Sequence, residues 1–161
     1  MRLGKCRTLL SREAEVFIRP SLARDTAYAM SQENVEVVRL CYELMRRGDI
    51  AALVDLADLE VEVRENVLPP DSAVYRGPDG LRKWFEVSQE AFSQFRFEPE
   101  RFIESGDWII APVHAYGRGR GSGAPFTARY VTAFKLRLGK IVVAASYRDL
   151  PEALEAAGLS E

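Results

Sequence analysis

Near residue 92 the spacing of apolar residues changes from the period of an amphipathic helix to a pattern typical of strands, which then lasts to residue 149. Before that point, apolar residues recur three or four positions apart in residues 31–47 and 78–92. After it, Phe95 and Phe97 alternate with Arg96 and Glu98, and three long strand candidates follow at 108–118, 126–137 and 141–149. Helices followed by a meander of strands predict an α+β domain, with an antiparallel sheet whose one face is covered by helices.

Residues at the ends of these segments fit the predicted elements. Ser31 suits the N-cap of the first helix, and Asp49 can cap a short second helix. Residues 60–64 alternate in the manner of a first strand. The proline-containing stretch 66–77 predicts a loop, after which Pro78 suits the first turn of a third helix.

Residues 1–29 differ in character from the rest of the chain. They carry a net charge of +3, against −5 for residues 30–161. Their short helical pattern is expected to end at Pro20, because proline lacks the backbone donor that a helix interior needs. The sequence therefore predicts an N-terminal extension, 1–29, that is disordered or foreign to the domain, and one domain over 30–161.

The overall charge excludes several classes of function. The net charge is −2, so no broad positive field attracts nucleic acid or an acidic membrane. No stretch approaches the roughly 20 apolar residues of a membrane span, and no signal-peptide pattern is present. Cys6 and Cys41 lie in dissimilar segments and form no CxxC motif. We expect a cytoplasmic protein without a disulfide.

Five stretches of the sequence resemble the SnoaL-like branch of the nuclear transport factor 2 superfamily. They are MSQENVEVVRLCYELMRRGDIAAL at 30–53, VEVRENVLPP at 61–70, YRGPDGLRKWFE at 75–86, GRGRGSG at 117–123 and LGKIVVAASYRDLPEALEAAGL at 138–159. The resemblance implies a cone-shaped domain in which a curved sheet and helices enclose an apolar pocket. It also implies a homodimer formed through the sheet. Relatives include cyclases, isomerases, epoxide hydrolases and dehydratases, so the fold does not fix the reaction.

The resemblance and the strand alternation together indicate which side chains face the pocket. The predicted ligand-binding residues are Tyr42, Val63, Trp84, Tyr130, Thr132, Phe134 and Ser146. Isomerase-like relatives place a base where Val63 stands, and relatives often carry His or Asp at Thr132 and an acid at Ser146. This chain has apolar or hydroxyl side chains at all three positions. Core packing is the alternative role for Tyr42 and Trp84.

Glu65 is the one catalytic candidate that the sequence offers. It follows Val63 by two positions and so shares its face of a regular strand. A carboxylate in an apolar pocket can abstract a proton, provided that a donor opposite stabilises the developing oxyanion. A solvated carboxylate at the end of a strand is the alternative. Whether the chain is an enzyme is left open, and no cofactor is expected.

His114 and the glycine-rich stretch have simpler explanations than catalysis or nucleotide binding. His114 alternates with small aliphatic residues, which predicts that it faces away from the helices. It is the only histidine, so a metal site is not expected. The stretch 117–123 links two strands, and without a following helix it lacks the phosphate-binding arrangement of dinucleotide sites. We expect a hairpin turn there and no nucleic-acid partner.

Two functions remain in competition. One is binding, with or without slow isomerase, cyclase or hydrolase chemistry, of a small apolar or cyclic molecule. The other is a non-catalytic homodimeric assembly or interaction protein whose cavity is filled by its own side chains. A pocket of at least about 300 Å³ favours the first function, and a filled cone favours the second.

Overall fold

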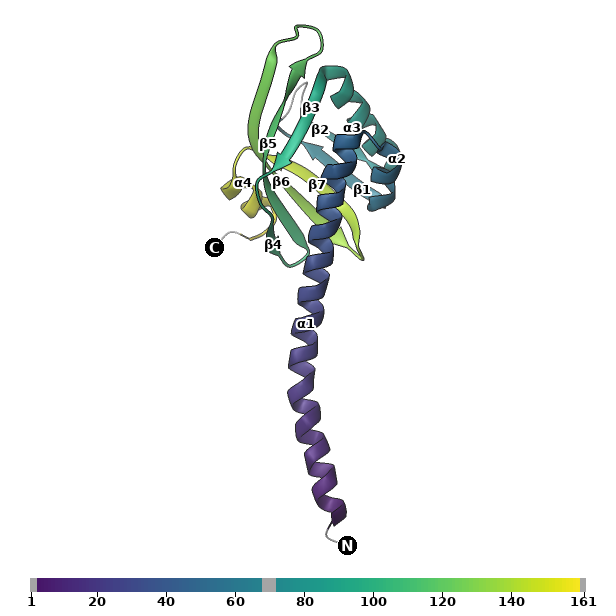
Figure 1. Cartoon of the computed structure of the whole chain (residues 1–161), viewed down its shortest axis with the longest axis vertical. Coiled ribbons are helices and arrows are strands. Elements are labelled where there is room, and N and C mark those ends of the chain that lie inside the picture. The colour runs from purple at the N-terminus through teal and green to yellow at the C-terminus, as the bar shows by residue number, and fades with distance from the viewer. Residues whose placement is uncertain (1–2, 68–71, 160–161) are drawn as a thin grey trace. The chain divides into compact units, whose positions relative to one another are not determined.

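The computed structural model describes residues 3–67 and 72–159, and for residues 3–23 the backbone alone. The chain divides into two compact units, Met1–Glu33 and Asn34–Glu161. Helix α1 (Leu3–Arg47) begins in the first unit, and its last turns and all the other elements belong to the second (Figure 1). Within the described residues, no helix is both long and apolar enough to cross a membrane.

Helix α1 differs from the sequence prediction in its extent. The pattern predicts a helix end at Pro20 and a new start at Ser31, yet both residues lie inside α1. Proline in a helix interior costs about 3 kcal/mol, mainly through one lost hydrogen bond and a steric clash. The next ten residues contain no glycine and no second proline, so helix propensity persists beyond Pro20. Both predictions are wrong, and the boundary after residue 29 remains a prediction.

Among the described residues, seven strands form one sheet in the order β2-β1-β7-β6-β5-β3, with β4 also paired to β5. The strands are β1 (Ala57–Glu65), β2 (Ala73–Arg76), β3 (Phe92–Pro99), β4 (Ile103–Ser105), β5 (Trp108–Gly119), β6 (Pro125–Arg137) and β7 (Lys140–Tyr147). The predicted α+β fold with a curved sheet is confirmed. The sheet is mixed rather than wholly antiparallel, because β1 runs parallel to β7. Strand β2 occupies part of the predicted loop 66–77.

Three short helices complete the second unit. Helix α2 (Ile50–Leu56) begins after Asp49, whose side chain accepts a 3.1 Å hydrogen bond from the backbone N–H of Ala52, as the sequence predicts. Helix α3 (Gly77–Ala91) has Pro78 in its first turn. Helix α4 (Leu150–Ala156) is capped by Asp149.

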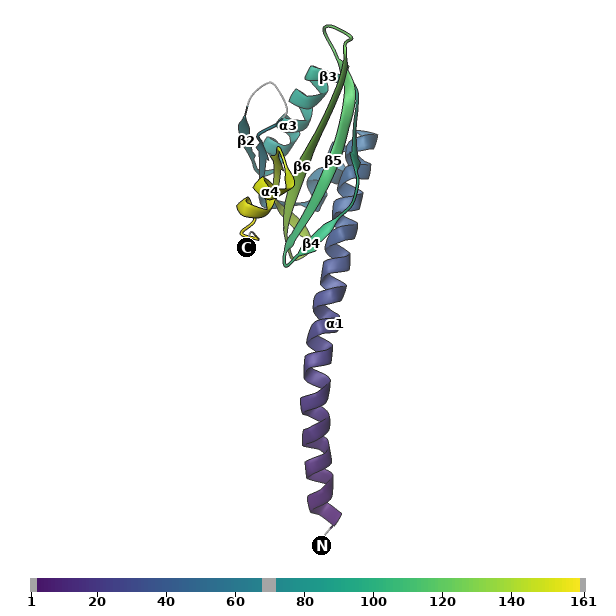
Figure 2. The ribbon, with the colours of Figure 1, turned by 90° about the vertical axis from the view of Figure 1, so that its left-hand side faces the viewer.

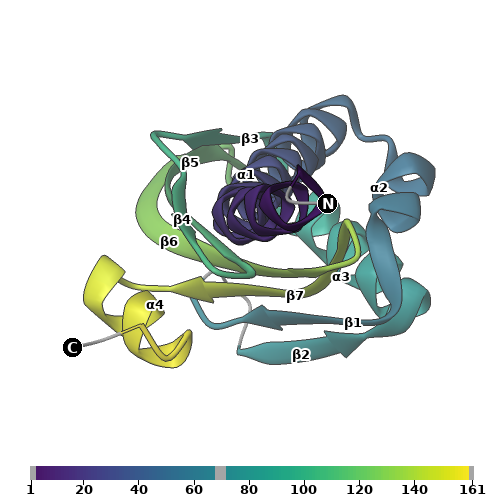
Figure 3. The same cartoon turned by 90° about the horizontal axis from the view of Figure 1, so that it is seen from below.

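The sheet is curved, and helices pack on its concave face. Register shifts interrupt β1, β3 and the β6–β7 pair, and such bulges bend a sheet and increase its twist. The last turns of α1 and helix α3 lie on the concave side (Figure 3). Val38 on α1 is fully buried there in one cluster with Ile109 of β5 and Val61 of β1. Burial of apolar surface on this side stabilises the cone.

The convex face is covered only in part. Helix α4 packs on β6 and β7 (Figure 2), where Ala153 forms a second buried cluster with Ile110, Val131 and Ala133. Thus one helix covers the face opposite to the others. The four residues of this cluster are buried within the chain, while Trp108 and Tyr147 beside them stay partly exposed.

The rest of the convex face is polar. His114 points outward, as predicted, and its Nε2 lies 2.8 Å from Thr127 Oγ1. Arg129 forms an ion pair with Glu100 at 2.7 Å. The strand registers align Glu98, His114 and Arg129 in one row across β3, β5 and β6. The homodimer that the resemblance implies remains a prediction, and a dimer through the strands of His114 and Arg129 requires pairing of polar groups.

The row of Glu98, His114 and Arg129 indicates which polar groups would pair in a dimer. A row with acidic and basic ends is self-complementary about a two-fold axis, since each end then meets the opposite charge of a second copy. We expect light scattering to report a dimer at micromolar concentration, and Arg129→Glu to shift it towards monomer. A wild-type monomer across that range would refute the prediction.

Gly80 on α3 lies close to the backbone of Tyr75 on β2. A Cβ at that position would lie 2.8 Å from the backbone carbonyl carbon of Tyr75, a separation that forces the helix or the strand to move. We expect Gly80→Ala to cost about 1–3 kcal/mol, as overpacking does, and to lower the Tm measured by calorimetry. Gly121→Ala is the matched control, because no atom lies within 4 Å of its added Cβ. Equal Tm values for the two variants would contradict this packing.

Candidate ligand-binding site

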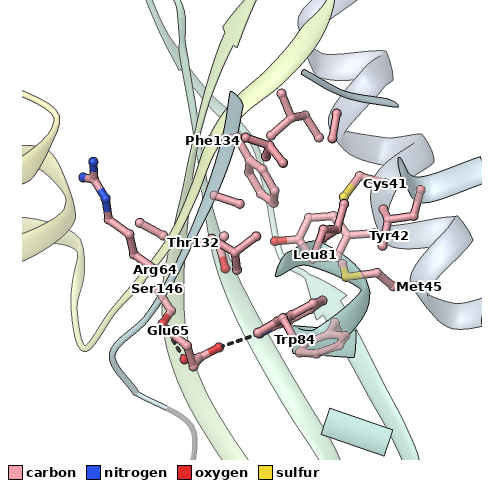
Figure 4. Close-up of a pocket in the computed structure, with 18 of the residues that line it drawn as sticks. Cys41, Tyr42, Met45, Arg64, Glu65, Leu81, Trp84, Thr132, Phe134 and Ser146 are labelled. Carbon is pink, nitrogen blue, oxygen red and sulfur yellow. Dashed lines mark hydrogen bonds between the residues drawn. The ribbon is translucent and has the colours of Figure 1, made fainter. Parts of the chain in front are cut away.

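A pocket opens between the end of α1, helix α3 and the concave face of β1, β6 and β7. The structure brings all eight residues nominated from the sequence to its walls: Tyr42, Val63, Glu65, Trp84, Tyr130, Thr132, Phe134 and Ser146 (Figure 4). The binding role of these residues remains a prediction. They lie on the strand and helix faces that line the pocket.

Strand register explains this convergence. Alternation along β6 places Tyr130, Thr132 and Phe134 on the concave face. Thr132 pairs with Ser146 across to β7, and Phe134 pairs with Ala144. The β7 positions are continued into β1, where Val63 lies opposite Ala144. One layer of side chains therefore runs across three strands beneath the helices.

The free space inside these walls is small. The cavity has a volume of about 60 Å³, which accommodates a few water molecules. Ligand pockets usually begin at about 300 Å³, so the expectation of a pocket of that size is not met by this side-chain arrangement. Met45 and Trp84 are partly exposed residues of the wall. A larger ligand requires side chains of this kind to move, and Met is the most adaptable of the apolar side chains.

Tyr42 carries the most unusual polar group of the pocket. The residue is 6 % exposed, and its Oη forms no hydrogen bond of good geometry among the described residues, although the Thr132 hydroxyl lies close enough to interact with it. Burial raises the pKa of Tyr42 far above its ordinary value, and the nearby Thr132 hydroxyl offsets this only in part. The phenol is therefore neutral at physiological pH. An unsatisfied buried hydroxyl costs about 1–3 kcal/mol, which a bound acceptor would recover.

Tyr130 and Thr132 extend this group of hydroxyls. Burial raises the pKa of Tyr130 well above its ordinary value, with smaller contributions in the same direction from Tyr42 and from the Glu65 carboxyl group. Thr132 again acts in the opposite direction, because its hydroxyl lies beside the phenol. The pocket thus presents three neutral hydroxyls on neighbouring positions of α1 and β6.

Glu65 lies at the other end of the pocket and is held by several donors. Ser146 Oγ donates to its Oε1 at 2.6 Å, and the backbone N–H of Val67 donates to the same oxygen at 3.2 Å. Trp84 Nε1 donates to Oε2 at 3.4 Å. Figure 4 shows the carboxyl group between Ser146 and Trp84, across the pocket from Tyr42. Donors on both oxygens suit the ionised form, which only accepts.

Ser146 is predicted to contact the ligand, but its hydroxyl forms hydrogen bonds within the protein. Its Oγ also accepts a 2.9 Å hydrogen bond from the backbone N–H of Asn66, and the Asn66 side chain donates to the Ser146 carbonyl at 3.1 Å. The hydroxyl is therefore engaged within the protein. It fixes the end of β1 to β7 and orients Glu65, rather than presenting a free donor to the pocket.

Sequence reasoning missed several walls of the pocket. Met45 lies three positions after Tyr42 on the same helical face, and Phe97 alternates with Arg96 and Glu98 on β3, so both carry the required signal. Leu53 and Ile141 come from elements whose orientation depends on distant contacts. Val63 contributes an apolar surface and no chemistry, as expected from its side chain.

The remaining chemically active residues do not assemble into a second site. Cys41 lines the pocket but is buried, whereas His114 lies on the convex face of the sheet, so the two form no nucleophile–base pair. Arg120, in the glycine-rich stretch, donates to the carbonyls of Gln89 and Phe92 at the end of α3. Within the described part of the chain, no three His, Cys, Asp or Glu residues cluster closely enough to hold a metal ion.

Comparison with known proteins identifies the domain. The sequence model of the SnoaL-like domain matches residues 38–144. No curated protein sequence matches the chain.

Solved structures share the architecture at low sequence identity. An NTF2-like protein from Burkholderia xenovorans LB400 is 22% identical, with a TM-score of 0.64 over 81% of this chain and 98% of that chain. A proposed SnoaL-like polyketide cyclase from Jannaschia sp. CCS1 is 17% identical, with a TM-score of 0.65 over 81% and 95%. SalBIII, an epoxide hydrolase/cyclase-like enzyme of pyran ring formation in salinomycin, is 19% identical, with a TM-score of 0.63 over 74% and 93%. These similarities establish the fold and not the reaction.

The burial of Cys41 predicts that its thiol reacts slowly in the native protein. Desolvation raises its pKa to about 12, so at pH 8 only roughly one thiol in ten thousand is ionised and reactive. In a Cys6→Ser variant, we expect a disulfide reagent at pH 8 to leave the native protein unlabelled and to modify Cys41 after denaturation. Fast labelling of the native variant would contradict this environment.

Proposed function

The chain belongs to the SnoaL-like domain family, and on that premise we propose that its pocket binds a small, mainly apolar molecule that carries one hydrogen-bond acceptor. The walls are mainly apolar, with the hydroxyls of Tyr42, Tyr130 and Thr132 at one end and the Glu65 carboxyl group at the other. Such a combination buries an apolar body and orients it by a few polar contacts.

The observation that carries this proposal is the Tyr42 hydroxyl. It is buried, neutral and unpartnered among the described residues. A protein that needed the tyrosine only for packing would lose nothing by having phenylalanine there, since the hydroxyl adds a desolvation cost without a compensating bond. A carbonyl or ether oxygen of a ligand provides the missing acceptor.

Glu65 gives the same pocket a possible reaction. A carboxylate opposite hydroxyl donors can abstract a proton next to a carbonyl or activate a water molecule. Two structurally similar proteins are a proposed polyketide cyclase and an epoxide hydrolase/cyclase-like enzyme, and reactions of these classes use such groups. This chain has no histidine or second carboxyl group among the pocket walls, so we propose binding with little or no turnover as its main property.

The cavity volume supports a second candidate. At about 60 Å³ the pocket is close to a cone filled by its own side chains. A non-catalytic homodimeric assembly protein would need no more space than this. The two candidates differ in one property, which is whether the pocket takes up a ligand in solution.

Matched probes test the role of Tyr42. Acetophenone and cumene have similar shapes, but only acetophenone has a carbonyl oxygen. We expect Tyr42→Phe to weaken acetophenone binding about 2- to 10-fold, the worth of one hydrogen bond, and to leave cumene binding unchanged. NMR titration of the Trp84 indole N–H measures both affinities, and the Trp108 indole, on the convex face, serves as an internal reference.

Two other outcomes decide against this proposal. Equal loss of affinity for both probes would show that Tyr42 acts by packing alone. Absence of binding for both probes in the wild type would favour the assembly function.

Catalysis is tested separately with model isomerase, cyclase and epoxide-hydrolase substrates. If one of them is turned over, we expect Glu65→Gln to abolish the rate, about a 10²- to 10⁴-fold loss for a general base, and Thr132→Val to lower it. Steady-state kinetics with both variants provide the measurement. Rapid turnover that survives Glu65→Gln would place the base elsewhere.

A further inference from the structure

The charge that the pocket presents is of one sign. Of its lining residues, Arg64 and Glu65 carry formal charges. The Arg64 guanidinium is turned towards the opposite face of β1, where its Nε donates to Glu62 at 2.6 Å (Figure 4). The Glu65 carboxyl group faces the cavity and accepts the hydrogen bonds described above. A ligand in the pocket therefore meets a negative group and no positive one among the lining side chains.

Aromatic rings form much of the remaining wall. Tyr42, Trp84, Phe97, Tyr130 and Phe134 all line the cavity. The face of an aromatic ring is electronegative and attracts cations, and several rings around one carboxylate form a common arrangement for binding alkylated ammonium groups. The two phenols are neutral, so they add no opposing charge.

We infer that the end of the pocket beside Glu65 selects a compact alkylammonium group over a neutral group of the same shape and excludes the corresponding anion, while the acceptor proposed for Tyr42 belongs to the opposite end of the ligand. The apolar walls favour an alkylated cation over an inorganic one. An inorganic cation is strongly hydrated and loses much hydration free energy on entering the pocket, whereas the alkyl groups gain from leaving water. An anion would approach the Glu65 carboxylate in a poorly hydrated space, where repulsion is strong. This inference rests on the proposed function and names the charge of the ligand within it.

Three probes with a common tert-butyl body isolate the effect of charge. They are tert-butylammonium, tert-butanol and pivalate, titrated into the full chain at pH 7 and constant ionic strength. We expect tert-butylammonium to shift the Trp84 indole resonance with a Kd at least about fivefold lower than that of tert-butanol. We expect pivalate to leave this resonance unmoved. The Trp108 resonance should stay in place with all three.

Variants on β1 locate the charge responsible. Glu65→Gln keeps the size of the side chain and removes its charge, so the preference for tert-butylammonium should fall to less than about twofold. Glu60→Gln is the matched control, because Glu60 lies on the same strand with its side chain 85% exposed. Its removal changes the net charge of the chain equally and should preserve the preference.

The result that overturns this inference is distinct from the failure of the proposed function. Tert-butanol binding as tightly as tert-butylammonium to the wild type overturns the cation preference, even if Glu65→Gln fails to fold. A preference lost equally in Glu60→Gln and Glu65→Gln also overturns it. If acetophenone binds while tert-butylammonium does not, the inference falls and the proposed function stands. If no probe binds, both fall.

Discussion

A carboxyl group beside an apolar cavity is stable only where donors satisfy it, and the site of this chain is built around that requirement. Glu65 takes hydrogen bonds from Ser146 on β7, Trp84 on α3 and the chain that follows β1. Each donor comes from a different part of the second unit. The interactions that keep Glu65 in place therefore also tie the end of β1 to β7 and to the middle of α3, three of the elements that line the pocket. Loss of any one donor makes both the Glu65 carboxyl group and the adjoining pocket wall less well fixed.

Tyr42 represents the opposite situation at the other end of the cavity. Its hydroxyl is buried without a partner among the described residues, whereas Glu65 is satisfied several times over. A fold that conserved every polar contact for its own stability would have no reason to leave this group unpaired. The contrast between a fixed carboxylate and an unsatisfied phenol supports the binding role that we propose for this cavity. The small cavity volume opposes ligand binding, because a ligand must displace side chains to enter.

The sequence predicts the site better than it predicts the connections around it. Alternation along residues 126–137 is a local property, and it correctly places Tyr130, Thr132 and Phe134 on the concave face. The pairing of Asn66 and Glu65 with Ser146 spans about 80 residues, so no local pattern indicates it. The parallel alignment of β1 with β7 has the same origin. The helix end expected at Pro20 failed because one missing hydrogen bond is small beside the propensity of a long helical segment. Cavity volume depends on the packing of every side chain and has no signature in the sequence.

The most direct test of the account is a high-resolution crystal structure of the purified full chain, examined for what lies beside the Tyr42 hydroxyl. The account predicts an acceptor atom of a bound molecule at about 2.6–2.9 Å from Tyr42 Oη, with Glu65 still held by Ser146 and Trp84. A pocket closed by its own side chains, with Tyr42 Oη bonded to a protein acceptor such as Thr132, would contradict it. That result would make the cavity part of the core and assign the function of the chain to its surface.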